Sequence, residues 1–128
     1  MAQSILDSVK KLNNIPPESD EFDTDIIMHI NSTFAVLRQI GAAPPEGFYI
    51  VDSAQTWEDF LVEPAQINMV RSYMALKVKQ LFDPPPTSFT QQSLSDVIKE
   101  YEVRLNYEEL VFNPYAYLLP AIPSSLDD

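Results

Sequence analysis

The first residues that could do chemistry form an acidic stretch, ESDEFDTD, at 18–25. Alternating carboxylates can wrap a calcium ion, but the glycine and the closing glutamate of an EF-hand loop are both missing here. The simpler interpretation is that Asp20 or Asp23 caps a following helix, because negative charge is favoured at a helix N-terminus. We therefore expect a helix cap at this point, and no metal site.

The single histidine, His29, is the second candidate. Asp25 lies four residues earlier on the same face of a predicted helix, but no third ligand with helical spacing lies nearby. His29 is also far from any glycine-hinged serine, which a Ser-His-Asp triad would require. Two glycines six residues apart cannot form a phosphate-binding loop, and the chain has no cysteine. The sequence thus predicts a binding or structural protein, with no catalysis, no cofactor and no metal.

The charge distribution limits the possible partners. The formal net charge is −11 over 128 residues, and residues 1–64 carry 3 basic and 11 acidic side chains. Residues 65–107 carry 5 basic and 4 acidic side chains, and residues 108–128 carry 4 acidic side chains and no basic one. No basic stripe is available to neutralise phosphates, so nucleic-acid binding is not expected. An acidic surface could instead let DNA pass without adhering, or meet a basic partner.

The N-terminus lacks the apolar core of a signal peptide, and no apolar run approaches the roughly 20 residues needed to cross a bilayer. We expect one domain that is cytosolic where it is made, with no membrane contact. Apolar residues at helical spacing predict an all-α fold, a small four-helix bundle with a proline-rich loop and an extended C-terminal arm. The predicted helices cover 3–13, 23–40, 65–82 and 88–107.

The predicted helix over 65–82 should be central. Its apolar stripe is wider than one neighbouring helix could cover, so we expect packing on two sides. Asp83 and the prolines at 84–86 end it, because proline donates no amide proton and disfavours helix before it. Thr87 or Ser88 should cap the next helix. The stripe consists of Ile67, Val70, Met74, Val78 and Leu81, widened by Tyr73 and Leu76.

Between the second and third long helices lies an irregular segment. Gly41 is expected to cap the helix over 23–40, and Thr56 to cap a single turn over 56–61 that turns Trp57 and Phe60 inward. The proline-rich loop over 42–55 contains a β-prone run. That run could pair with a neighbouring subunit or cover the core of its own chain, and both interpretations stay open. The run is Phe48, Tyr49, Ile50 and Val51.

The last residues differ in character from the rest. We assign residues 1–107 to a helical domain and residues 108–128 to an extended arm, because the second range has no helical period and is rich in proline and aromatic residues. A monomer has little reason to leave such apolar side chains in water. The segment either packs on its own domain or docks on another protein. The residues in question include Phe112, Tyr115, Tyr117, Leu118 and Leu119.

Four segments in order carry a family resemblance: 6–41, TWEDFL at 56–61, YMALKVKQLFDPPPTSF at 73–89, and EYEVRLN at 100–106. Together they resemble the small head-to-tail connector (adaptor) proteins of long-tailed phages and of prophages in Gram-positive bacteria. The order of the motifs and the Leu-Phe-Asp-Pro-Pro stop are the distinctive parts. The resemblance covers residues 5–107 and does not include the arm.

This resemblance implies a structural virion protein. It would form a ring of copies, matching a twelvefold portal, in the neck at the head-tail junction, after assembly in the host cytoplasm. The ring would extend the channel through which DNA passes without specific binding, and would offer a platform to a stopper or tail-completion protein. We predict that the arm, through Phe112, Tyr115, Tyr117, Leu118 and Leu119, contacts the portal or a neighbouring subunit. The loop, through Phe48, Tyr49 and Ile50, is predicted to contact a subunit or the stopper.

The alternative is an acidic phage-encoded inhibitor that imitates DNA and occupies a host nucleic-acid enzyme. The charge of −11 is compatible with that function. A duplex mimic needs an extended run of negative charge, however, and residues 65–107 are close to neutral. The connector is therefore the favoured prediction.

Overall fold

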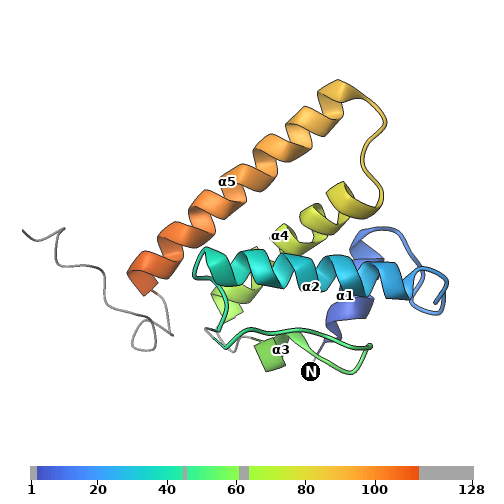
Figure 1. The fold of residues 1–128 in the computed structure, drawn as a ribbon, viewed down its shortest axis with the longest axis horizontal. Coiled ribbons are helices and arrows are strands. Elements are labelled where there is room, and N and C mark those ends of the chain that lie inside the picture. Colours follow the sequence, from blue (N-terminus) through green and yellow to red (C-terminus); the bar gives the residue numbers. More distant parts are fainter. Residues whose placement is uncertain (1–2, 45, 61–63, 113–128) are drawn as a thin grey trace, which may run out of the picture.

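The computed structural model describes residues 3–44, 46–60 and 64–112, which form five helices (Figure 1). No strand occurs in these ranges, and the one isolated antiparallel bridge in them joins Ser4 to Thr56. The predicted all-α class is confirmed. The helices are α1 (Ile5–Leu12), α2 (Asp23–Gln39), α3 (Trp57–Phe60), α4 (Pro64–Phe82) and α5 (Ser88–Phe112).

Helix α4 is the central element, as predicted. It packs against α1 and α2 on one side and against α5 on the other (Figure 1). Its residues Val70, Tyr73, Met74 and Val78 are fully buried. The prediction for Leu81 is wrong, because this side chain is 45% exposed. Leu81 lies in the last turn of α4, immediately before the connection to α5.

Helices α1 and α2 end in the same way. After each, one residue adopts a left-handed backbone conformation: Asn14 with φ 63° and Gly41 with φ 88°. The backbone amide of the following residue then donates a hydrogen bond to a carbonyl in the last turn of the helix. Ile15 donates to Lys10 at 2.8 Å, and Ala42 donates to Leu37 at 2.8 Å. This is the Schellman arrangement, which satisfies carbonyl groups that a helix end leaves unpaired. The predicted capping role of Gly41 is confirmed.

Lys10 is a buried cation that joins α1 to the start of α2. Its side chain is 1% exposed, and its Nζ donates to the carbonyl oxygens of Pro17 at 3.0 Å and Ser19 at 2.6 Å. The same Nζ lies 2.8 Å from Asp23 Oδ1. Such partners offset the large cost of removing an ammonium group from water. The predicted acidic cap is therefore wrong: Phe22 is the N-cap of α2, and Asp23 pairs with Lys10 instead of capping.

A polar contact joins α4 to α5. The Tyr73 hydroxyl donates to Glu102 Oε2 at 2.7 Å, and Lys77 Nζ lies 3.9 Å from the same oxygen. Burial, followed by the hydrogen bond to Glu102 and the negative charge of that carboxylate, raises the pKa of Tyr73 well above its usual range. The phenol thus stays protonated and keeps its hydrogen bond throughout the neutral range.

Helix α5 is longer than predicted. It continues through Phe112, so residues 108–112, which we expected to begin an extended arm, are helical. Its inner face is as predicted: Leu94, Ile98, Tyr101 and Leu105 pack on the core. Thr87 is the cap, because its Oγ1 accepts the Thr90 amide at 3.1 Å. Residues 113–128 lie outside the described part of the chain.

We expect Lys10→Ala to lower the free energy of unfolding by about 2–3 kcal/mol, because it removes hydrogen bonds to a charged group and leaves two carbonyl groups and Asp23 without their partner. Lys11→Ala is the matched control, since Lys11 is exposed and its loss should change stability by less than about 0.5 kcal/mol. Urea unfolding of both variants measures the difference. Equal effects would show that the buried contacts of Lys10 do not stabilise the fold.

Tyr73→Phe should cost about 1–2 kcal/mol at pH 7, because it removes the hydrogen bond to Glu102. The wild type should also lose stability as pH rises above 10.0, the ordinary pKa of tyrosine, since the unfolded chain releases this proton there while the folded chain retains it. The variant should lack that part of the alkaline decline. Tyr49→Phe, at an exposed phenol, is the control and should change neither value. Urea unfolding at several pH values between 7 and 11 provides the measurement.

Candidate functional site

Residues 42–55, here called the flap, connect α2 to the turn before α3 and cover one side of the core. Phe48 packs edge-to-face on Phe34 of α2, with ring centroids 5.1 Å apart, and on Phe60 of α3 at 5.3 Å. Ile50 is buried. The inner side of the flap therefore covers the core of its own chain, which is one of the two interpretations that the sequence left open. A contact between the outer side and another subunit remains a prediction.

The side chain of Asn31 holds the middle of the flap against α2. Its Oδ1 accepts the Ile50 amide at 2.7 Å, and its Nδ2 donates to the Ile50 carbonyl at 2.9 Å. One amide side chain thus satisfies both backbone groups of Ile50, as a neighbouring strand would. Because successive residues of an extended chain face opposite ways, Tyr49 and Val51 point outward and are 69% and 61% exposed. The flap presents these two apolar side chains on a fixed backbone.

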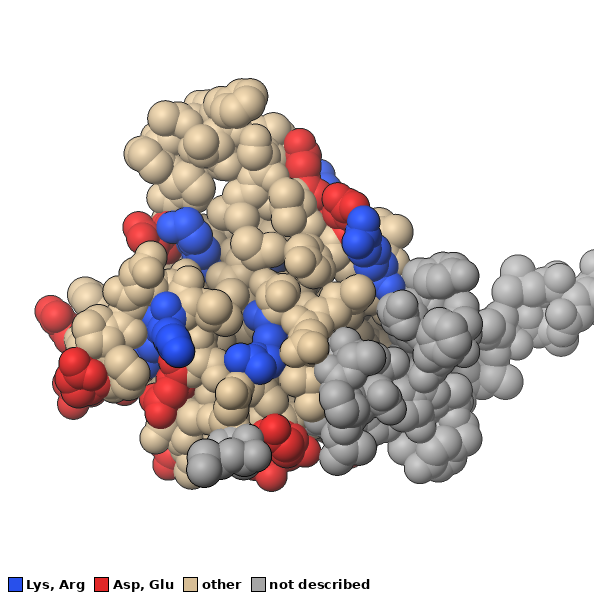
Figure 2. Space-filling model, turned by 180° about the vertical axis from the view of Figure 1, so that it is seen from behind, with Lys and Arg blue, Asp and Glu red and all other residues tan. Residues whose placement is uncertain are grey.

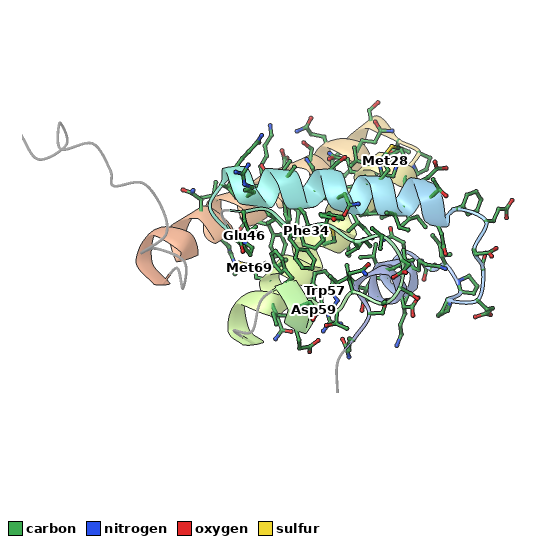
Figure 3. All side chains as sticks on the ribbon, turned by 60° about the horizontal axis from the view of Figure 1, so that its bottom comes forward. Met28, Phe34, Glu46, Trp57, Asp59 and Met69 are labelled. Carbon is green, nitrogen blue, oxygen red and sulfur yellow. The ribbon has the colours of Figure 1, made fainter. Side chains whose placement is uncertain are left out.

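The turn at α3 anchors the end of the flap. Thr56 Oγ1 accepts the Asp59 amide at 3.2 Å, and Asp59 Oδ2 accepts the Thr56 amide at 2.9 Å, which is the predicted capping box. Trp57 is buried and lies near Phe34, with centroids 6.4 Å apart (Figure 3). The predicted inward orientation of Trp57 and Phe60 is confirmed. Glu46, Asp52, Glu58 and Asp59 are exposed, and residues 42–55 carry no basic side chain of their own, although Arg38 of α2 lies beside Gly47.

A second exposed feature lies at the opposite end of the molecule. Residues 84–95, here called the corner, join α4 to α5 and include the first two turns of α5. The corner projects beyond the other helices (Figure 1) and has neither acidic nor basic side chains, so it is tan throughout in Figure 2. Phe89, in its helical part, is 80% exposed.

The residues considered for metal or ligand chemistry do not converge. His29 is half-buried and its ring faces Phe82, with centroids 6.4 Å apart, while Asp25 is exposed. Within residues 3–44, 46–60 and 64–112, no cluster of three His, Cys, Asp or Glu could hold a metal ion. Residues of α1 and α4 line a shallow cleft of 340 Å³, among them Asp7, Lys11 and Arg71. The Arg71 guanidinium lies 6.0 Å from the Trp57 ring centre, so this side chain also supports the packing of α3.

Of the residues predicted for the arm, Phe112 is the last residue of α5. Tyr115, Tyr117, Leu118 and Leu119 lie outside the described residues, so their role stays a prediction. Neither Asn31 nor Phe89 was among the residues predicted to have a functional role. A mid-helix asparagine beside the buried stripe and an aromatic residue off the stripe of α5 are the signals that could have indicated them.

The fold and these surfaces define a small all-α protein whose exposed features suit contacts with other proteins. The chain matches the family model described as phage connector protein over residues 5–110, and it belongs to that family. No curated protein and no solved structure matches it. None of the helices in the described ranges is both long and apolar enough to span a membrane.

We expect Asn31→Ala to release the flap, because it removes two hydrogen bonds to Ile50, each contributing about 1 kcal/mol. The free energy of unfolding should fall by about 2 kcal/mol, and the Ile50 amide should exchange with solvent faster. Ser32→Ala, at the next and exposed position of α2, should leave both unchanged. Hydrogen exchange followed by NMR measures the Ile50 amide directly. Unchanged protection in Asn31→Ala would mean that other contacts hold the flap.

Proposed function

We propose that this protein is an adaptor that forms a ring beneath the portal of a phage head. The ring extends the channel for DNA and provides a docking platform for a stopper or tail-completion protein. The observation that carries the proposal is the match to the phage connector family over residues 5–110 of the 128. The proposed location is the neck of the virion, with assembly in the host cytoplasm.

The geometry of a closed ring supports this function. A ring of identical copies uses heterologous contacts, in which one surface of each copy meets a different surface of the next. Among the exposed apolar side chains of the described residues, Tyr49 and Val51 of the flap and Phe89 of the corner lie on two different surfaces. The number of copies follows from the partner: a twelvefold portal would be matched by twelve adaptors.

The charge of the chain is compatible with a DNA channel. A wall of net negative charge repels phosphates at short range, so DNA moves past without adhering. With −11 charges per copy, a ring of adaptors would be strongly acidic as a whole. The proposed role therefore involves no specific contact with DNA.

In this proposal, the C-terminal arm makes the contact with the portal. Because α5 continues through Phe112, the arm available for docking is residues 113–128, which include Tyr115, Tyr117, Leu118 and Leu119. An apolar, proline-rich sequence of this kind suits the groove or sheet edge of a larger assembly. The helical body and the arm would then have separate roles, in ring formation and in attachment.

Electron microscopy of the protein mixed with its cognate portal tests the function. We expect an additional ring on one end of the portal, with the symmetry of the portal. A chain ending at Phe112 should keep the unfolding midpoint of the full chain but bind portal at least about tenfold more weakly, because the docking segment is gone. The control is Tyr49→Ser, which should retain binding of single copies through the intact arm. Portals that never acquire density from the full chain would contradict the proposed function, and normal attachment of the shortened chain would contradict the role of the arm.

A further inference from the structure

Most of the corner lacks packing partners within its own chain, although Leu94 near its end packs on the core. Residues 86–93 are exposed without exception, although 88–93 are helical. Helical turns gain most of their stability from tertiary packing, and serine, threonine and phenylalanine are not strong helix formers. Phe89 is 80% exposed at this position. A partner that covers Phe89 would stabilise the segment as well as remove apolar surface from water.

The charge of the corner indicates what kind of partner approaches it. Each copy carries a net charge of −11, so two copies repel one another over most of their surfaces. Residues 84–95 contain no Asp, Glu, Lys or Arg, and Asp83 and Asp96 flank them. The corner can therefore dock on an acidic surface of another copy without like-charge repulsion and without burying a charged side chain.

The flap provides such a surface. Tyr49 and Val51 are exposed apolar side chains on a backbone held by Asn31 and Gln55, whose Oε1 accepts the Val51 amide at 2.8 Å. Exposed acidic residues lie on both sides of them in sequence, at Glu46 and Asp52. This surface would repel another acidic face and admit an uncharged one. The flap and the corner lie at opposite ends of the molecule, so a copy cannot bring its own two surfaces together (Figure 1).

We propose that the corner of one copy docks on the flap of the next, with Phe89 packed against Tyr49 and Val51. The contact is heterologous, since it joins two different surfaces, and its repetition around an axis generates a closed ring. This inference rests on the proposed ring function and names the contact that forms the ring. Portal and stopper are then contacted by other surfaces.

Cysteine pairs test the contact, because the full chain contains no native cysteine. Ser88→Cys places a thiol beside Phe89 and Ser53→Cys places one near Val51, both at exposed positions. Each variant is prepared separately and oxidised alone or as a mixture, in the presence of cognate portal. We expect disulfide-linked dimers in the mixture, and only monomers from either variant alone. Val103→Cys, at an exposed position beyond the middle of the same helix, replaces Ser88→Cys as the control and should give none.

Each result of this experiment decides the question. Dimers from Ser88→Cys alone would indicate a symmetric contact between two corners and overturn the proposal. If rings form on the portal but the mixture gives no dimers, the proposed contact between corner and flap is wrong. The adaptor function would still hold, and the corner would then face the portal or the stopper. The absence of any ring from the unmodified chain would overturn both the adaptor function and this contact.

Phe89→Ser provides an independent measurement in the otherwise unmodified chain. It should leave the unfolding midpoint of the monomer unchanged, since Phe89 is exposed, and weaken ring formation by about tenfold or more. Val103→Ser is the matched control, because Val103 is 70% exposed on the same helix but lies outside the corner. Equal ring formation by both variants would contradict the assigned role of Phe89.

Discussion

The ring of Phe34 holds together the segments on which the surface features of this protein depend. It lies on α2 and contacts Phe48 of the flap at 5.1 Å, Trp57 at 6.4 Å and Phe60 of α3 at 4.8 Å. The described residues of the flap include no strand or helix, and α3 is a single turn, so regular backbone hydrogen bonds contribute little to either. Aromatic burial replaces them and supplies a large part of the local stability. The outward side chains of the flap are in place because the inward ones are packed on Phe34.

Local features of the sequence were sufficient to predict most of the helical framework. The spacing of apolar residues located the four longest helices, because the side chains on one face of a helix recur at a fixed period. The Thr56–Asp59 capping box and the left-handed Gly41 were also predictable, since each depends on residues close together in sequence. The two-sided burial of α4 followed from the width of its stripe. Each of these features depends on the sequence of its own segment and not on contacts with distant parts of the chain.

Features that depend on contacts between distant segments were missed. Lys10 and Lys11 are identical in type, and only the approach of residues 17–23 makes one buried and leaves the other exposed. Leu81 continues the stripe of α4 but is 45% exposed in the fold. The end of α5 was placed too early on a change in composition. Pro114 was the better signal, because a helix commonly ends shortly before a proline, and α5 ends at Phe112. The exposed positions of the flap and the corner cannot be read from local pattern, since exposure is a property of the whole fold.

The isolated bridge between Ser4 and Thr56 affects the order in which the chain can fold. The Ile5 amide donates to the Gln55 carbonyl at 3.0 Å and the Trp57 amide to the Gln3 carbonyl at 3.1 Å, so these bonds close a loop of about fifty residues. Closing so long a loop costs chain entropy before any contact is gained, whereas α4 and α5 are joined by a short connection. Local contacts form fastest, so the α4–α5 hairpin is the natural nucleus. We expect the N-terminal half to close around this hairpin afterwards.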